Sequence, residues 1–252
     1  MCLIAFHWQP GAALPLQVWA NRDEFLARPA SATGFWPDAP QVLAGRDLTG
    51  GGTWMGVTRQ GRFAALTNFR DPAMPAGTRS RGQLVSGFLL GDDSPADWAR
   101  RAQADWRDYG GFSLLVADAG SLWYAGSHAG EAFAVTPGWH GLSNALLDTP
   151  WPKLRRLVDG ARQLSAAGAD AGDPAEAGLA LLTDTTPAVD AELPDTGVGL
   201  AMERVLSPVC IRTPAYGTRN STWLRLGRDE IIWQERDHVR GERLDFRFPR
   251  LA

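Results

Sequence analysis

Strand-like segments lie at both ends of this 252-residue sequence, and helical patterns occupy blocks between them. Pairs of short apolar segments around a Gly-containing turn predict three hairpins: residues 2–8 with 16–20, 53–58 with 62–67, and 112–117 with 121–125. Helices are predicted over residues 84–90, 95–104, 153–166 and 174–182. Single strands are predicted over residues 133–135, 205–211, 221–226, 231–235 and 244–248, and none within the Pro- and Gly-rich residues 28–52. This order favours two packed sheets covered by helices over a parallel βαβ array.

The composition is typical of a globular protein. A chain of 252 residues with 44% apolar residues can bury a large core without disulfides or metals, so we expect one domain over residues 1–252. The 25 Lys and Arg residues and 28 Asp and Glu residues give a net charge of −3, which disfavours nucleic acid and anionic membranes as partners. Lys153 is the only lysine, a bias typical of GC-rich genomes.

Cysteine usage and the first residues indicate the cellular compartment. Cys2 and Cys210 are too few for a disulfide framework and lack the CxxC spacing of zinc or redox sites. The sequence begins without a basic leader, and no segment reaches the roughly 18 apolar residues of a membrane span. We therefore expect a cytoplasmic protein without a membrane span, and the sequence leaves its oligomeric state open.

Cys2 is the first candidate for chemistry. Its small side chain permits removal of Met1, which would leave a thiol and a free α-amine on the same residue. A thiol has a reference pKa of about 8.5 and an α-amine one of about 7.7–8.0, so the amine is a suitable base for this nucleophile. The alternative interpretation is a cysteine that simply begins a buried strand.

The tetrapeptide Asn21-Arg22-Asp23-Glu24 ends the second predicted strand. If the first two strands pair, this end of the hairpin lies near Cys2. Arg22 would then lower the pKa of the thiol, and either Asp23 or Glu24 would orient the α-ammonium group. The alternative is a charged turn whose side chains make solvated ion pairs.

Two asparagines and one arginine complete the candidate site. Asn68 and Asn144 each end a short apolar segment, and amide donors of this kind stabilise the oxyanion formed in acyl transfer. Arg219 precedes the predicted strand over residues 221–226, where it would hold a carboxylate or a polarised carbonyl. The alternative interpretations are turn-forming asparagines and an ordinary loop arginine.

Cofactor sites have weaker support in the sequence. The four histidines show no paired metal-ligand spacing, so we predict no metal site, although any one of them could ligate haem. The 11 tryptophans would line an apolar ligand cavity or, for most of them, pack in the core. Residues 50–52 are all Gly but lack the Lys of a phosphate-binding loop, so they predict a close-packed turn before a strand.

Several longer segments occur in a fixed order between Met1 and Thr222: MCLIAF, ANRDEF, GGTWMGV, RFAALTNFRDP, SRGQLV, GLSNALLDTPWPKL and VCIRTPAYGTRNST. Together they resemble the NRDE-motif family, whose animal members are called transport and Golgi organization protein 2. The resemblance implies an α+β fold of the N-terminal-nucleophile hydrolase type, an αββα four-layer sandwich of two antiparallel sheets. It also implies Cys2 at the nucleophile position, and links to haem trafficking and to acyl-lipid or acyl-CoA metabolism.

A more distant resemblance is to the choloylglycine hydrolase and penicillin V acylase group, which also begins Met-Cys and cleaves amides. The roles that it implies by position are nucleophile for Cys2, oxyanion donor for Asn68 and Asn144, and distal arginine for Arg219. In that group two residues separate the Arg and the Asp after the second strand, whereas Arg22 and Asp23 are adjacent here. The choice between Asp23 and Glu24 as the acid therefore stays open.

Two functions from different classes follow. The first is an N-terminal-cysteine amidohydrolase, a hydrolase of non-peptide C–N bonds that acts on a small or acyl-bearing amide and requires no cofactor. The second is a non-catalytic carrier of haem or of an acyl lipid or acyl-CoA, in which Arg residues pair with propionate or phosphate groups. A degenerate fold retained for protein interaction is a third hypothesis.

Overall fold

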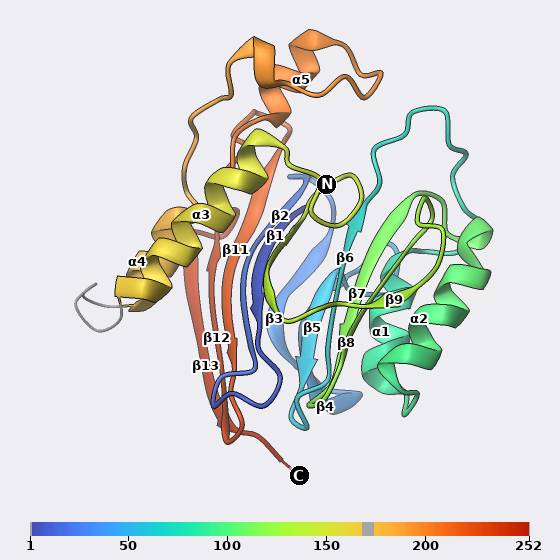
Figure 1. Ribbon diagram of the computed structural model, residues 1–252, viewed down its shortest axis with the longest axis vertical. Coiled ribbons are helices and arrows are strands. Elements are labelled where there is room, and N and C mark those ends of the chain that lie inside the picture. The colour runs from blue at the N-terminus through green and yellow to red at the C-terminus, as the bar shows by residue number, and fades with distance from the viewer. Residues whose placement is uncertain (1, 168–173, 252) are drawn as a thin grey trace.

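Two antiparallel sheets packed face to face form the centre of the computed structural model, which describes residues 2–167 and 174–251 (Figure 1). In this part of the chain the first sheet contains, in spatial order, β10 (Gly138–Leu142), β1 (Cys2–Trp8), β2 (Leu16–Phe25), β11 (Tyr216–Leu226), β12 (Glu230–Asp237) and β13 (Glu242–Pro249). The second sheet contains β3 (Ala30–Trp36), β4 (Ala39–Asp47), β5 (Met55–Thr58), β6 (Phe63–Asn68), β7 (Phe112–Ala117), β8 (Leu122–Gly126) and β9 (Phe133–Ala134).

Helices cover the outer faces of both sheets (Figure 1). The second sheet carries α1 (Gly82–Leu90) and α2 (Pro95–Ala104), and the first carries α3 (Pro152–Ala167) and α4 (Pro174–Leu181). The other helical segments among the described residues are α5 (Leu200–Leu206) and the 3₁₀ turns η1 (Trp106–Asp108) and η3 (Asp190–Glu192). The Ser94 side chain caps α2 by accepting a hydrogen bond from the Asp97 amide. This is a four-layer αββα arrangement, so the predicted α+β fold class is confirmed.

The apolar run at the start of the sequence follows from the position of β1 between two layers. Ile4 and Phe6 project into the core between the sheets, whereas Leu3 and Ala5 project into the core under α3 and α4. Successive side chains of a strand point to opposite faces, so a strand covered on both faces is apolar throughout. By the same alternation, Cys2 faces the second sheet.

The predicted hairpins and the helices α1 to α4 are confirmed, but several other segments differ from the prediction. The strand predicted over residues 205–211 is wrong, because α5 extends to Leu206 and Pro208 follows it. Residues 28–52 contain β3 and β4, which the Pro and Gly content obscured. The register of this pair shifts between Ser31 and Gly34, an irregularity that accommodates such residues at the edge of a sheet. The short strand β10 was also not predicted.

Gly52 packs against the backbone at the start of α1, as expected for a close-packed turn before β5. A Cβ atom on Gly52 would lie 2.4 Å from the carbonyl carbon of Gly82. We expect Gly52→Ala to lower the free energy of unfolding by about 1–3 kcal/mol, because backbone atoms must move to admit the methyl group. Thermal unfolding measures this effect. Gly34→Ala is the matched control, since nothing lies within 4 Å of its Cβ position, and equal melting temperatures for the two variants would contradict the prediction.

Candidate active site

A cavity of about 540 Å³ opens between the two sheets at the start of β1. The first sheet contributes Cys2, the segment from Arg22 to Glu24 and Arg219, and β6 of the second sheet contributes Asn68. Residues 74–82, which precede α1 and include its first residue, also line it. Segments that are far apart in the sequence thus meet around the thiol.

Cys2 pairs with Arg22 in the antiparallel register of β1 and β2, so the predicted proximity of the two residues is confirmed. Residues directly opposite in such a pair project from the same face of the sheet. Burial raises the pKa of the Cys2 thiol, and the charge of Asp23 raises it further; the charge of Arg22 and the backbone N–H of Asp23 act in the opposite direction. Arg22 therefore acts in the predicted direction, but burial outweighs its charge and leaves the pKa of the thiol raised.

Arg22 is 8% exposed and makes no hydrogen bond or ion pair within the described ranges 2–167 and 174–251. Its guanidinium charge is consequently available to an anion in the cavity. A buried cation without a partner is unfavourable, so the arrangement suits a site that receives negative charge from a thiolate or a ligand.

Asp23 and Glu24 differ sharply in their surroundings. Asp23 is 1% exposed and accepts a hydrogen bond from the Thr218 hydroxyl at 2.6 Å. Burial raises the pKa of the Asp23 carboxyl, while the charge of Lys153 opposes that shift. Glu24 accepts the N–H of its neighbour Phe25 at 2.8 Å and is partly exposed. Of the two acids, Asp23 is the one enclosed beside Cys2.

The two candidate asparagines occupy different positions. Asn68 lines the cavity, and its side chain makes no hydrogen bond within the described ranges. Asn144 does not line the cavity; its side-chain amide donates to the carbonyl oxygen of Asn68 at 3.0 Å. Ser143, next to it, donates to the carbonyl oxygen of Cys2 at 3.4 Å. The structure thus places Asn68 in the cavity wall and Asn144 behind it, and the oxyanion-donor roles of both stay predictions.

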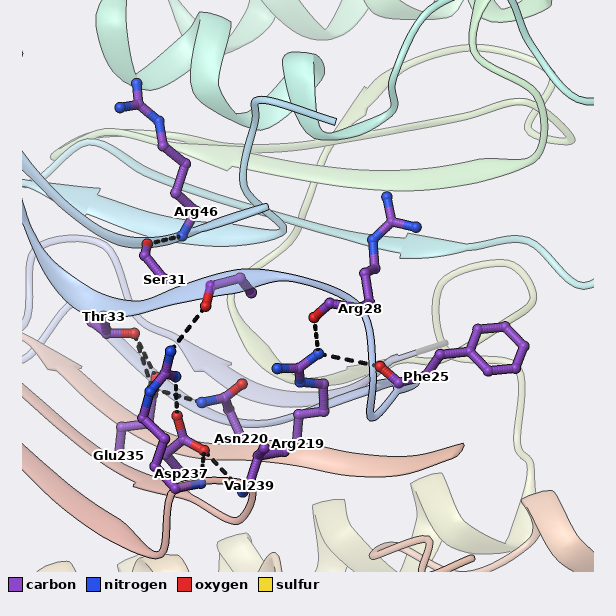
Figure 2. A network of polar contacts seen from close by, with 12 residues as sticks. Phe25, Arg28, Ser31, Thr33, Arg46, Arg219, Asn220, Glu235, Asp237 and Val239 are labelled. Carbon is purple, nitrogen blue, oxygen red and sulfur yellow. Dashed lines mark hydrogen bonds and ion pairs between the residues drawn. The ribbon is translucent and has the colours of Figure 1, made fainter. Parts of the chain in front are cut away.

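Arg219 lies inside β11 rather than before a strand, which corrects its predicted position. The register between β11 and β2 shifts between Thr218 and Asn220, so Arg219 occupies a β-bulge. Its guanidinium group donates to the backbone carbonyls of Phe25 and Arg28 (Figure 2). Arg219 therefore fixes the end of β2 while lining the cavity.

Glu235 forms a buried hydrogen-bond centre along the cavity that the sequence analysis did not identify (Figure 2). It accepts from the side chains of Thr33 at 2.9 Å, Asn220 at 2.9 Å, Thr222 at 3.0 Å and Trp233 at 3.3 Å. Burial raises the pKa of this carboxyl, and the hydroxyl donors oppose the shift. Because Thr33 belongs to β3, this network joins the two sheets. Buried and partly exposed residues alternate along β12, and this pattern places Glu235 on the buried face. An acid at a buried position of a strand was the sequence signal for this site.

Asp237 and Arg240 continue the network toward the start of β3. The Arg240 guanidinium lies 2.7 Å from the Asp237 carboxylate and donates to the carbonyl oxygen of Ala30 at 2.9 Å.

Arg81, which precedes α1, is a further residue of the cavity wall. It was not predicted as a site residue, although it belongs to the family-like segment SRGQLV. Burial lowers the pKa of Arg81 and the charge of Cys2 opposes this, so the two groups interact.

The four candidate histidines do not line the cavity. No histidine lines it within the described ranges, and Trp54 is the only tryptophan there. His7 stacks on Trp139, whereas His128, His140 and His238 bond to Asp71, Asp148 and Ser221. Among the described residues, no group of three or more His, Cys, Asp or Glu could hold a metal ion. The arginines of the lining suit a ligand with negative charge.

The fold of the chain has a counterpart among solved structures. The crystal structure of the mutant C2A conjugated bile acid hydrolase from Clostridium perfringens has the same architecture, with a TM-score of 0.53 and 11% sequence identity. The similarity covers 98% of this chain and 92% of that chain. The fold is therefore that of the N-terminal-nucleophile hydrolases.

The chain belongs to the Transport and Golgi organisation 2 family, whose model matches residues 1–237. The homologue of Transport and Golgi organization protein 2 from Bos taurus is 36% identical, over 94% of this chain and 92% of the relative. The Homo sapiens homologue is 34% identical over the same shares of both chains. A search of the described residues finds no helix long and apolar enough to cross a membrane.

Proposed function

We propose that the chain is an N-terminal-cysteine amidohydrolase that cleaves a small or acyl-bearing amide. The observation that carries the proposal is the Cys2 thiol, which lines a polar cavity beside an unpaired Arg22 and the amide of Asn68. A protein of the same fold, a conjugated bile acid hydrolase, was crystallised as the mutant C2A. That protein supports the use of this scaffold for hydrolysis.

The reaction begins once Met1 has been removed. The α-amine of Cys2 accepts the thiol proton, and the thiolate attacks the amide carbonyl to form a tetrahedral oxyanion. The Asn68 amide donates to this oxyanion, and Asn144 holds Asn68 in place. The α-ammonium group then protonates the departing amine, which leaves a thioester on Cys2. Water attacks the thioester with the α-amine as base, releases the carboxylic acid and restores the thiol.

Asp23 is the acid that this mechanism assigns to orient the α-amine. It is enclosed on the first sheet next to Cys2, whereas Glu24 bonds to its own neighbour at the rim. Arg22 stabilises the thiolate, since it faces the same side of the sheet and has no other partner among the described residues.

Alkylation of the two thiols tests the proposal. Intact mass first establishes that Met1 is absent, and iodoacetamide should then label Cys2 faster than Cys210, because only Cys2 has a neighbouring base. The matched control is the same protein with an uncleaved N-terminal extension, in which Cys2 has no free α-amine. Equally slow labelling of Cys2 in both proteins, or retention of Met1, would contradict the proposal.

A carrier function is the second candidate, and the arginines that line the cavity favour it for a ligand with a phosphate or carboxylate group. The cavity arginines are Arg22, Arg28, Arg46, Arg79, Arg81, Arg219 and Arg240. A carrier would bind an acyl-CoA or haem saturably and release it unchanged, whereas the hydrolase would release a free acid from an N-acyl amide. Haem titration followed by the Soret band distinguishes the haem version, and product analysis distinguishes the others.

A further inference from the structure

Lys153 is a buried charge behind the nucleophile. It lies in the first turn of α3, is 2% exposed, and its Nζ makes no hydrogen bond within the described part of the chain. Lysine side chains usually extend so that the ammonium group reaches water. An enclosed ammonium group without a hydrogen bond is unfavourable unless nearby charges compensate it. The position of Lys153 therefore requires an electrostatic explanation.

Four ionisable groups from four segments lie near Lys153, whose helix α3 packs against β1: Cys2 of β1, Asp23 of β2, Arg70 after β6 and Glu203 of α5. Arg70 and Glu203 form an ion pair of 2.7 Å, and each side chain is at least nine-tenths buried. Asp23 and Lys153 are the largest charge contributions to each other. The cluster thus contains two cations and two acids, in which Lys153 compensates Asp23.

We propose that Lys153 is the positioning residue of the nucleophile: its buried ammonium group keeps the α-amine of Cys2 in the neutral form that accepts the thiol proton. The inference rests on the proposed function, in which the amine exposed by removal of Met1 is the base. A carboxylate alone would hold that amine as an ammonium ion, and a second cation nearby opposes its protonation. Asp23 then orients the α-amine but does not keep it protonated.

The charge of Lys153 is present at the pH where it is needed. Burial lowers the pKa of Lys153 to about 8, and the charge of Asp23 opposes that shift. The side chain is therefore mainly cationic at neutral pH, and it loses its charge only above the pH at which the α-amine must already be neutral.

Lys153 also makes the α-amine easier to measure. Lys153 is the only lysine and is buried, so the α-amine is the one primary amine open to a reagent.

Acetylation of the α-amine tests this inference directly. A short pulse of acetic anhydride at a series of pH values, followed by peptide mass spectrometry, gives the apparent pKa of the α-amine in the intact protein. We expect a value below the reference of about 7.7–8.0 in the wild type. Lys153→Met should raise that value by about one pH unit, because a cation at short range is removed from a poorly solvated site.

Arg155→Met is the matched control, since it removes a cation two residues further along α3. Arg155 is half exposed and pairs with Glu192, so solvent and salt screen its charge and the α-amine should titrate as in the wild type. A thermal melt shows that each variant is folded. An unchanged or lowered α-amine pKa in folded Lys153→Met would overturn the inference. An apparent α-amine pKa above about 8.0 in the wild type would also overturn the inference, and this measurement requires no variant.

The readout separates this inference from the proposed function. If the α-amine shifts as expected but no amide is cleaved, the role of Lys153 stands and the hydrolase proposal fails. If hydrolysis depends on Cys2 but Lys153→Met leaves the α-amine unchanged, only the role of Lys153 fails. Retention of Met1 would overturn both.

Discussion

Replacing Cys2 with alanine is expected to lower the rate of amide hydrolysis at least about 10³-fold, because in the proposed reaction this residue supplies the atom that forms the thioester. Alanine also permits removal of Met1, so the variant keeps the α-amine and loses only the thiol. The side chain is small and lies at the first position of β1, and therefore its loss should leave the melting temperature nearly unchanged. The measurement is kcat/KM for the amide that the wild type cleaves.

Cys210→Ala provides the control for this result. Cys210 is the other cysteine of the chain, it is buried, and it does not line the cavity. Its replacement should leave kcat/KM unchanged even if the melting temperature falls. Rapid quenching of the wild type should show a mass increase equal to the acyl group on the N-terminal peptide. Comparable hydrolysis by Cys2→Ala and by the wild type would rule out the thioester.

Arg70→Met is expected to lower the free energy of unfolding by about 3–5 kcal/mol, the largest stability effect we predict. The Arg70 guanidinium lies 2.7 Å from the Glu203 carboxylate, and the two side chains are 6% and 3% exposed. Methionine fills similar volume but leaves the carboxylate buried without its cation. Urea denaturation measures the loss, which should appear as a lower midpoint.

The control for Arg70→Met is again Arg155→Met, which breaks an exposed ion pair of 3.0 Å and should cost about 1 kcal/mol or less. The double variant Arg70→Met with Glu203→Leu should recover part of the lost stability, because it removes both charges. Equal losses for Arg70→Met and Arg155→Met would show that the buried pair has no special role in stability.

Local patterns predicted most of the strands that position the site. The paired apolar segments before and after residues 9–15 fixed the hairpin of β1 and β2, and with it the pairing of Cys2 with Arg22. Local patterns failed where tertiary packing decides the outcome. β3 and β4 form despite their Pro and Gly residues because buried side chains such as Val42 and Leu43 contribute to the core. Val205 suggested a strand, but the segment before Pro208 is helical.

The candidate site was predictable only in part, for a related reason. Cys2, Arg22, Asp23, Asn68 and Arg219 all line the cavity, as their place at strand ends suggested. The remaining groups depend on contacts between segments that no local pattern reveals. Glu235 acquires its role from partners on two other strands, β3 and β11, and on its own strand β12. Lys153, which composition alone explained as a genomic bias, acquires its role from a fold that buries it.

The position of β1 also has a consequence for biosynthesis. Cys2 precedes in the sequence every strand on which β1 depends: β1 lies between β2 and β10, and β2 in turn requires β11. The nascent chain must therefore be made beyond residue 226 before the first sheet can close around the thiol. Contacts of such large sequence separation form late and slowly. Under the proposed function, a chain truncated before β11 would carry the Cys2 thiol without the closed sheet that surrounds it with its activating groups.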